Sequence, residues 1–203
     1  PDGSRSFCGN GSRCAFAYWS LSLEGGIQGR FTAIDGLHSG KWEGAEVSIS
    51  LPDLPLVDID SAEPGTDFVN TGSPHELVWS PAVDAVPITE DGQRRRYASR
   101  HGAGGSNINY IQPMDGGIRM RTYERGVEAE TLSCGSGVVA AALSAVQRDV
   151  TTPPVRVDTR GGRLMVHMSR REAGYTDVRL VGPVKQVFTG TIELCPWLGA
   201  PLG

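Results

Sequence analysis

Two short segments of the chain place a cysteine directly before a glycine-rich turn and an apolar run. The first is Cys8-Gly9-Asn10-Gly11 and the second is Cys134-Gly135-Ser136-Gly137. Glycines let the backbone turn tightly and approach a ligand, and the run that follows each has the composition of a buried helix. The positive end of a helix dipole lowers the pKa of a cysteine placed there. The two segments therefore predict two reactive thiols, each at a helix entrance.

Two such thiols suit proton transfer at an acidic carbon. A thiolate can remove a proton from one face of the carbon while a thiol delivers one to the other face, which inverts the configuration. The free N–H groups of a helix entrance also bind a carboxylate, and this helps the adjacent carbanion to form. The four histidines show no zinc-ligand spacing around the cysteines. We therefore expect neither a cofactor nor a metal.

Composition sets limits on the partners. The chain has 203 residues, 39% of them hydrophobic and 21% charged, with a formal net charge of −4. This balance argues against general binding to nucleic acid or to an anionic membrane. No apolar stretch approaches the roughly 20 residues of a membrane span, and no signal-peptide pattern opens the chain. We expect a cytoplasmic protein with a small-molecule substrate, and leave open whether it is a homodimer.

The long spacing between the two cysteine segments indicates a duplicated domain with one thiol in each half. It exceeds the period of about 20 to 50 residues that is typical of solenoid repeats. Residues 52–66 hold three prolines and several acids, a composition that interrupts a sheet. We therefore expect a boundary there, with a first half at 1–56 plus 183–203 and a second half at 57–182.

Strand patterns surround the two helices. The stretch 35–44 is rich in turn residues, Arg94–Arg96 predicts a solvated loop face, and 183–188 is expected to cross back to the first half. Two strand-rich halves, each wrapped around one helix, are the simplest arrangement. The expected strands are 29–34, 46–51, 68–69, 76–79, 107–111, 117–123, 155–158, 163–168 and 177–181, and a further helix signal covers 139–148.

Other residues carry weak signals when each is taken alone. His75 could orient a thiol or exchange protons with it, although a lone histidine after a turn is more often structural. Glu124 and Arg125 are typical of a loop after a strand, and Asn107 indicates only a strand or turn amide. The remaining cysteines, Cys14 and Cys195, are expected to be buried or incidental.

In order and spacing, however, the motifs together resemble the diaminopimelate epimerases over nearly the whole chain. The family interconverts LL- and meso-2,6-diaminopimelate, without pyridoxal phosphate or metal, on the route to lysine and peptidoglycan. The fold that the resemblance implies is α/β (α+β), with two pseudo-symmetric halves, each a curled, mostly antiparallel sheet around a central helix. The motifs are Asp2-Gly3-Ser4, Cys8–Cys14, Gly72-Ser73-Pro74-His75, Tyr123-Glu124-Arg125-Gly126, Glu130-Thr131 and Cys134–Gly137.

The resemblance also implies a role for each site residue. Cys8 and Cys134 would be the two acid/base thiols, and His75 and Glu124 would support them. Two further groups would bind substrate: Gly9, Asn10, Gly135 and Ser136 would cradle the reacting carboxylate, and Asn107, Glu124 and Arg125 would hold the amino and distal carboxylate groups.

The chain departs from the family pattern in three places. The family has a strand-rich segment before Asp2, so we expect the N-terminal part of the first half to be missing from this sequence. Ser73 stands where many members have asparagine, and the loop at Val127–Ala129 is one residue longer than in common members. Two alternatives stay open: a proline or hydroxyproline racemase, which shares the two-thiol logic, and a truncated homologue without catalysis.

Overall fold

The computed structural model describes residues 7–23 and 25–191. The helices are α1 Gly9–Ser22, α2 Ile88–Arg96 and α3 Gly135–Gln147, with short 3-10 turns η1 Val83–Ala85 and η2 Ser99–His101. The strands are β1 Gln28–Ala33, β2 Gly36–Glu43, β3 Glu46–Ser50, β4 Leu54–Pro55, β5 Thr66–Asn70, β6 Pro74–Trp79, β7 Asn107–Met114, β8 Gly117–Glu124, β9 Ala129–Thr131, β10 Val155–Thr159, β11 Gly162–Arg171 and β12 Gly174–Gly182.

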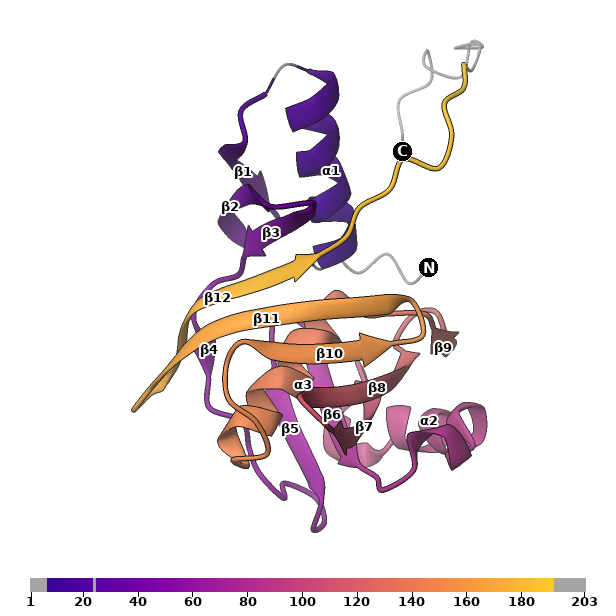
Figure 1. Ribbon diagram of the computed structural model, residues 1–203. Helices are drawn as coiled ribbons and strands as arrows, with labels where there is room; N and C mark the ends of the chain where they lie inside the picture. Colours follow the sequence, from indigo (N-terminus) through magenta and orange to yellow (C-terminus); the bar gives the residue numbers. More distant parts are fainter. Residues whose placement is uncertain (1–6, 24, 192–203) are drawn as a thin grey trace.

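These strands join in one curled, mostly antiparallel sheet (Figure 1), whereas the sequence predicts a separate curled sheet for each half. Its order is β1-β2-β3-β12-β11-β10-β8-β7-β6-β5, with β4 also beside β12 and β9 beside β8. Among the described strands, β6 pairs with β7 and β8 pairs with β10 in parallel, and the other pairs are antiparallel. Because β12 pairs with both β3 and β11, the sheet continues from the α1 end of the molecule to the α3 end.

Helix α3 fills the inside of the curl. All residues of Gly137–Val146 are buried, and the helix contacts β5, β6, β7, β8, β10, β11 and β12. Its interior is mainly alanine and valine, whose short side chains let strands pack closely from several sides. The helix predicted after the second cysteine is therefore confirmed, and it is buried as expected.

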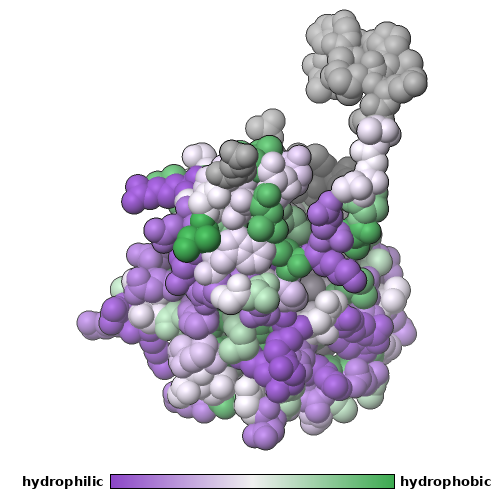
Figure 2. Space-filling view, turned by 45° about the horizontal axis from the view of Figure 1, so that its top comes forward, coloured by the Kyte–Doolittle hydropathy of each residue, from purple (hydrophilic) through white to green (hydrophobic). Residues whose placement is uncertain are grey.

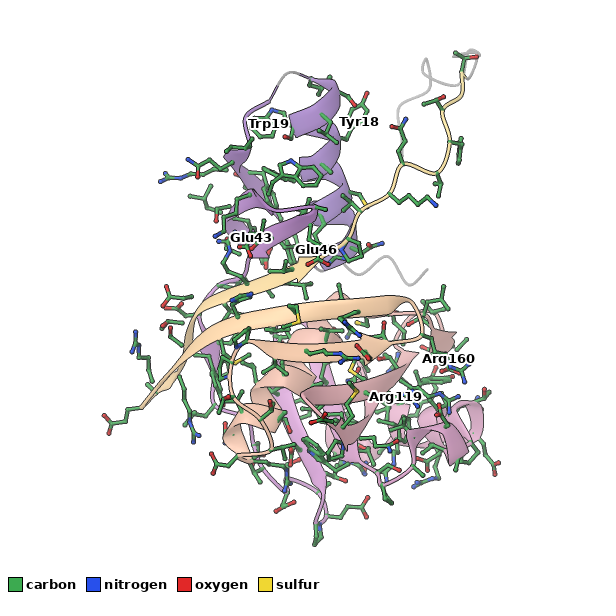
Figure 3. The ribbon with its side chains drawn as sticks, in the orientation of Figure 1. Tyr18, Trp19, Glu43, Glu46, Arg119 and Arg160 are labelled. Carbon is green, nitrogen blue, oxygen red and sulfur yellow. The ribbon has the colours of Figure 1, made fainter. Side chains whose placement is uncertain are left out.

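Helix α1 lies at the other end of the sheet and is buried on one side only. Phe16 packs on β2 at Gly40, where an added Cβ would overlap the phenyl ring. Tyr18 and Trp19 lie on the outer half of the helix (Figure 3), with 63% and 38% of their surface exposed. Hydrophobic side chains gather at this end of the surface (Figure 2). The prediction of a buried first helix is wrong for this outer face.

Strand β2 occupies the stretch for which turns were predicted. The turn residues lie at its two ends, where Gly36 and Gly44 adopt φ values of 132° and 63°. The strand between them pairs with β1 and β3. The prediction is wrong because glycine at Gly40 serves the contact with α1 rather than a turn.

Helix α2 contains the basic run for which a solvated loop was predicted. Arg95 has only 12% of its side chain exposed and bonds to Glu63, Glu76 and Asp91. Arg96 pairs with Glu128 at 3.1 Å. Arginines in the last turn also face the negative end of the helix dipole. Tertiary ion pairs, which a local pattern does not reveal, therefore stabilise this helix.

The segment after β12 returns beside α1 but forms no strand. A cavity of about 470 Å³ is lined by Tyr18 and Cys14 of α1 and by Val184 and Phe188 of this segment. Cys14 was expected to be either buried or incidental, and its exposure on α1 excludes the first of these two possibilities. Cys195 lies outside the described residues.

Candidate active site

The two cysteines hold the same position at the start of a helix, as the sequence predicts. Cys8 is the N-cap of α1, with φ −111° and ψ 99°, and Cys134 is the N-cap of α3, with φ −114° and ψ 112°. At an N-cap the first N–H groups of the helix have no partner within the helix, so they are free to donate hydrogen bonds to a ligand. Each thiol therefore lies beside a set of free backbone donors.

The two helix entrances meet at their first glycines. A Cβ added to Gly135 would lie 3.3 Å from Cα of Gly9, and one added to Gly9 would lie 2.9 Å from Cδ2 of Leu180. Larger residues at either position would push the helices apart. Glycine at these positions therefore brings two segments that are far apart in the sequence to one place.

A cavity of about 170 Å³ opens where the entrances meet. Every site residue predicted from the sequence lines it except His75. Phe7, Ser73 and Ser133 line it as well, and no sequence signal assigned Phe7 or Ser133 to the site. The full lining is Phe7, Cys8, Gly9, Asn10, Ser73, Asn107, Glu124, Arg125, Ser133, Cys134, Gly135 and Ser136.

Cys134 is the enclosed member of the pair, with 8% of its surface exposed. Burial raises the pKa of its thiol, and the nearby Glu124 carboxylate raises that pKa further, while bonds from Ser136 and the backbone of Gly137 lower it. Its Sγ lies 3.5 Å from Oγ of Ser136. The expectation of a lowered pKa is therefore wrong for this cysteine, because loss of solvent outweighs the helix dipole.

Cys8 is exposed at the opposite entrance. Its Sγ accepts a hydrogen bond from the backbone N–H of Gly11 at 3.3 Å. This bond satisfies one of the free donors of α1 in the way that a serine or aspartate N-cap would. The thiol is therefore held at the cavity by its own helix.

Arg13 supports the first entrance and was not predicted as a site residue. Its Nη2 donates to Oδ1 of Asn10 at 3.2 Å, and its Nη1 donates to the carbonyl of Gly9 at 3.4 Å. The residue is only 5% exposed, and this burial lowers the pKa of its guanidinium. A cation thus lies directly behind the backbone donors of α1, where it favours an anionic ligand.

Asn107 organises the far side of the cavity. Its Nδ2 donates to Oγ of Ser73 at 2.8 Å and to the carbonyl of Pro74 at 3.0 Å. Its Oδ1 accepts from the backbone N–H of Arg125 at 2.9 Å. These bonds connect the start of β6 and the start of β7 to the end of β8, so the asparagine holds three strand ends around the site.

Glu124 and Arg125 remain available to a ligand. Both line the cavity, and within the described residues neither forms an ion pair. Their charges are opposite and adjacent, which suits the amino and carboxylate groups of an amino acid. The structure thus places both residues on the same cavity as the two cysteines.

His75 lies behind the cavity wall instead of in the cavity. Its Nε2 lies 3.1 Å from Oγ of Ser136, and the residue is fully buried. Burial, with a smaller contribution from Arg125, lowers the pKa of His75 to about 3. A neutral imidazole therefore reaches Cys134 through one intervening hydroxyl.

A larger cavity of about 490 Å³ lies elsewhere and is lined by several arginines. Arg119 and Arg160 lie near each other at this side of the α3 end (Figure 3). Arg119 pairs with Asp84 at 2.7 Å, and Arg160 pairs with Glu130 at 3.1 Å. Because these charges satisfy one another, the smaller cavity at the helix entrances is the candidate site.

Two further features are absent from the described part of the chain. None of its helices is long and apolar enough to cross a membrane. None of its His, Cys, Asp and Glu side chains form a group of three or more that could hold a metal ion.

Comparison with known proteins agrees with this geometry. Residues 68–185 match the sequence profile of the family described as diaminopimelate epimerase. The diaminopimelate epimerase of Flavobacterium psychrophilum is 35% identical over 195 residues, which cover 94% of this chain and 75% of the relative. The chain belongs to the diaminopimelate epimerase family. The member from Aquifex aeolicus is 36% identical over 207 residues, which cover 95% of this chain and 72% of that enzyme.

Solved structures of other proteins share the fold of this chain. A probable proline racemase from Agrobacterium radiobacter K84 aligns with a TM-score of 0.67 at 16% identity and covers 97% of this chain and 71% of that protein. A predicted epimerase from Pseudomonas aeruginosa aligns with a TM-score of 0.56 at 14% identity. The alignment covers 87% of this chain and 73% of that protein. At these identities the likeness concerns the fold alone.

Proposed function

We propose that this chain interconverts LL- and meso-2,6-diaminopimelate with Cys8 and Cys134 as its two proton-transfer groups. The observation that carries the proposal is the meeting of the two helix entrances at Gly9 and Gly135, with both thiols on one cavity. Membership of the diaminopimelate epimerase family supports this choice of substrate.

The reaction needs one thiolate and one thiol on opposite faces of the substrate Cα. The thiolate removes the Cα proton and becomes a thiol, while the other thiol delivers its proton to the opposite face and becomes a thiolate. The configuration inverts, and the two sulfurs have exchanged protonation states. Proton exchange with water then restores the starting pair. The scheme includes no cofactor.

The helix entrances stabilise the charge that develops between these steps. Removing the Cα proton shifts negative charge onto the adjacent carboxylate, and free N–H groups at Gly9, Asn10, Gly135 and Ser136 are placed to bind it. The buried cation of Arg13 adds to this potential through Asn10. Donors fixed in advance on two helices need no rearrangement during the reaction.

Binding of the remaining substrate groups falls to the far side of the cavity. Arg125 suits the distal carboxylate and Glu124 suits an ammonium group. Asn107 holds the backbone of Arg125 and the hydroxyl of Ser73 in place. In this scheme Asn107 acts on substrate mainly by fixing its neighbours.

Exchange of the Cα hydrogen in deuterated water tests the proposal in the intact protein. Cys8→Ala and Cys134→Ala should each lower epimerisation by about 10² to 10⁴-fold, which is typical of a lost acid or base. Cys14→Ala is the control, because Cys14 is exposed on α1 outside the cavity lining. Near-normal turnover in either of the first two variants would contradict the mechanism. Faster exchange with proline than with diaminopimelate would contradict the substrate.

A further inference from the structure

A second asparagine on β7, Asn109, lies behind the Cys134 entrance and outside the cavity lining. It is fully buried, and the parallel register of β6 and β7 places it diagonally from His75 on the same side of the sheet. Thr122 of β8 lies directly opposite it. A buried amide needs a hydrogen-bond partner for each of its polar atoms, and all the partners of Asn109 can be identified.

The orientation of the Asn109 amide follows from those partners. Its Nδ2 lies 3.2 Å from the backbone carbonyl of Glu76, and a carbonyl can only accept a hydrogen bond. The NH₂ group therefore faces β6, where its other hydrogen points to Nδ1 of His75 at 3.1 Å. The Oδ1 atom accepts from the hydroxyl of Thr122 at 3.0 Å.

This orientation sets the direction of every later hydrogen bond. Because Nδ1 of His75 accepts, a neutral imidazole carries its proton on Nε2 and donates it to Oγ of Ser136 at 3.1 Å. The Ser136 hydroxyl is then free to donate its own hydrogen to Sγ of Cys134 at 3.5 Å. The chain of donors thus ends on the sulfur.

We propose that Asn109 is a positioning residue for Cys134, because its amide fixes the His75 tautomer that directs the Ser136 hydroxyl to the sulfur. The inference rests on the proposed role of Cys134 in proton transfer. A donor aimed at sulfur stabilises the thiolate more than the thiol. This opposes the effects of burial and of the nearby titratable groups Glu124 and Cys8, all of which raise the pKa of the Cys134 thiol.

At Gly137, helix α3 packs closely against the hydrogen-bonded side chains of Asn109 and His75. A Cβ at Gly137 would lie 2.5 Å from Oδ1 of Asn109 and 3.3 Å from Cε1 of His75. Glycine at the fourth position of the motif therefore leaves space for the amide and the imidazole behind the Cys134 entrance.

Nitrogen NMR of the resting protein tests the proposal without substrate. With ¹⁵N-labelled histidine, and with the His75→Gln spectrum to assign its signals, His75 at pH 7 should be a neutral imidazole protonated on Nε2. In its ionised form the isosteric Asn109→Asp side chain can only accept hydrogen bonds, so this variant should move the proton of His75 to Nδ1. A wild-type His75 protonated on Nδ1, or on both nitrogens, would overturn the proposal whether or not the two-thiol reaction is correct.

Kinetics then test the connection to the sulfur. Asn109→Asp should lower kcat about tenfold at neutral pH and shift the basic limb of the Cys134 profile upward by about one pH unit, while KM changes little. In a Ser136→Ala background the same substitution should have almost no further effect on kcat. An equal loss in both backgrounds would show that Asn109 acts only on the fold, and an unchanged pH profile would also overturn the proposal. Inactivity of the wild-type protein toward diaminopimelate would contradict the proposed function instead.

Discussion

The two helix entrances share a sequence pattern but have opposite surroundings. Cys8 is exposed and is bonded by the N–H of Gly11 in its own helix. Cys134 is enclosed and is reached by a chain of polar side chains from two strands. The motifs differ at their third position, where Asn10 accepts from Arg13 and Ser136 accepts from His75. The third motif residue therefore contacts a cation at one entrance and a neutral imidazole at the other.

The comparison indicates two ways of supporting a thiol. At the α1 entrance, solvent, a helix N–H and a nearby guanidinium are available. At the α3 entrance, solvent is lost and fixed hydrogen bonds replace it, so their directions matter more. We therefore expect changes behind Cys134 to have larger effects than matched changes behind Cys8.

Alanine in place of the last glycine of each motif, Gly137 or Gly11, should give the largest difference in stability between the two entrances. Gly137→Ala places a methyl group 2.5 Å from Oδ1 of Asn109, which combines overpacking with disruption of a buried hydrogen bond. Its free energy of unfolding should fall by about 3 kcal/mol. In Gly11→Ala the nearest atom is Sγ of Cys8 at 3.3 Å, and alanine favours the helix by about 0.5–1 kcal/mol. Urea unfolding of the two variants measures the contrast, and equal losses would contradict it.

The pH dependence of stability should reveal the buried imidazole behind Cys134. His75 has a pKa of 6.5 when unfolded and about 3 when folded. Between those values the unfolded state binds one more proton than the folded state. The contribution of the buried neutral His75 to the stability of the fold is therefore complete above about pH 6.5 and is lost as the pH falls toward 3. The slope from this residue is about 1.4 kcal/mol per pH unit. His75→Gln should remove that slope in denaturant titrations, and identical slopes in the two proteins would contradict the assignment.

The smallest of these expected effects is a difference in the alkylation rates of Cys8 and Cys134. At neutral pH iodoacetamide should modify Cys8 at least about tenfold faster than Cys134, because burial restricts access and raises the pKa of Cys134. Exposed Cys14 provides an internal reference on the same helix as Cys8. Peptide mapping at successive times gives the three rates. Modification of Cys134 first would contradict the enclosed environment described above.

Much of this arrangement could be predicted from local sequence. The alternation of apolar residues locates most strands, and the two glycine motifs locate both helix entrances. All the site residues named from these motifs and from the family resemblance, except His75, line the cavity, whereas Phe7 and Ser133 were missed. Helix α2 was not predicted because it is stabilised by ion pairs to Glu63, Glu76 and Glu128, which lie elsewhere in the sequence. Strand β2 was not predicted because Gly40 is typical of a turn, whereas in the structure it lies in a strand and packs against Phe16.

The environment of the thiols could not be predicted in the same way. A helix dipole is a local property, whereas the burial of Cys134 depends on strands from elsewhere in the chain. The role of Asn109 was missed although a signal existed, since a polar side chain within the apolar run of β7 requires buried partners. Which partners it finds depends on the parallel register with β6.

Peptide mapping after mild oxidation most directly tests the central claim that the two thiols face one substrate carbon. The entrances touch at Gly9 and Gly135, and a disulfide can form only where two cysteine Cα atoms come within about 7 Å. In the intact protein without substrate, oxidation should join Cys8 to Cys134 and abolish activity, a thiol reductant should restore it, and bound substrate should protect. A disulfide between Cys8 and Cys14, or inactivation that leaves Cys134 free, would contradict the two-thiol site.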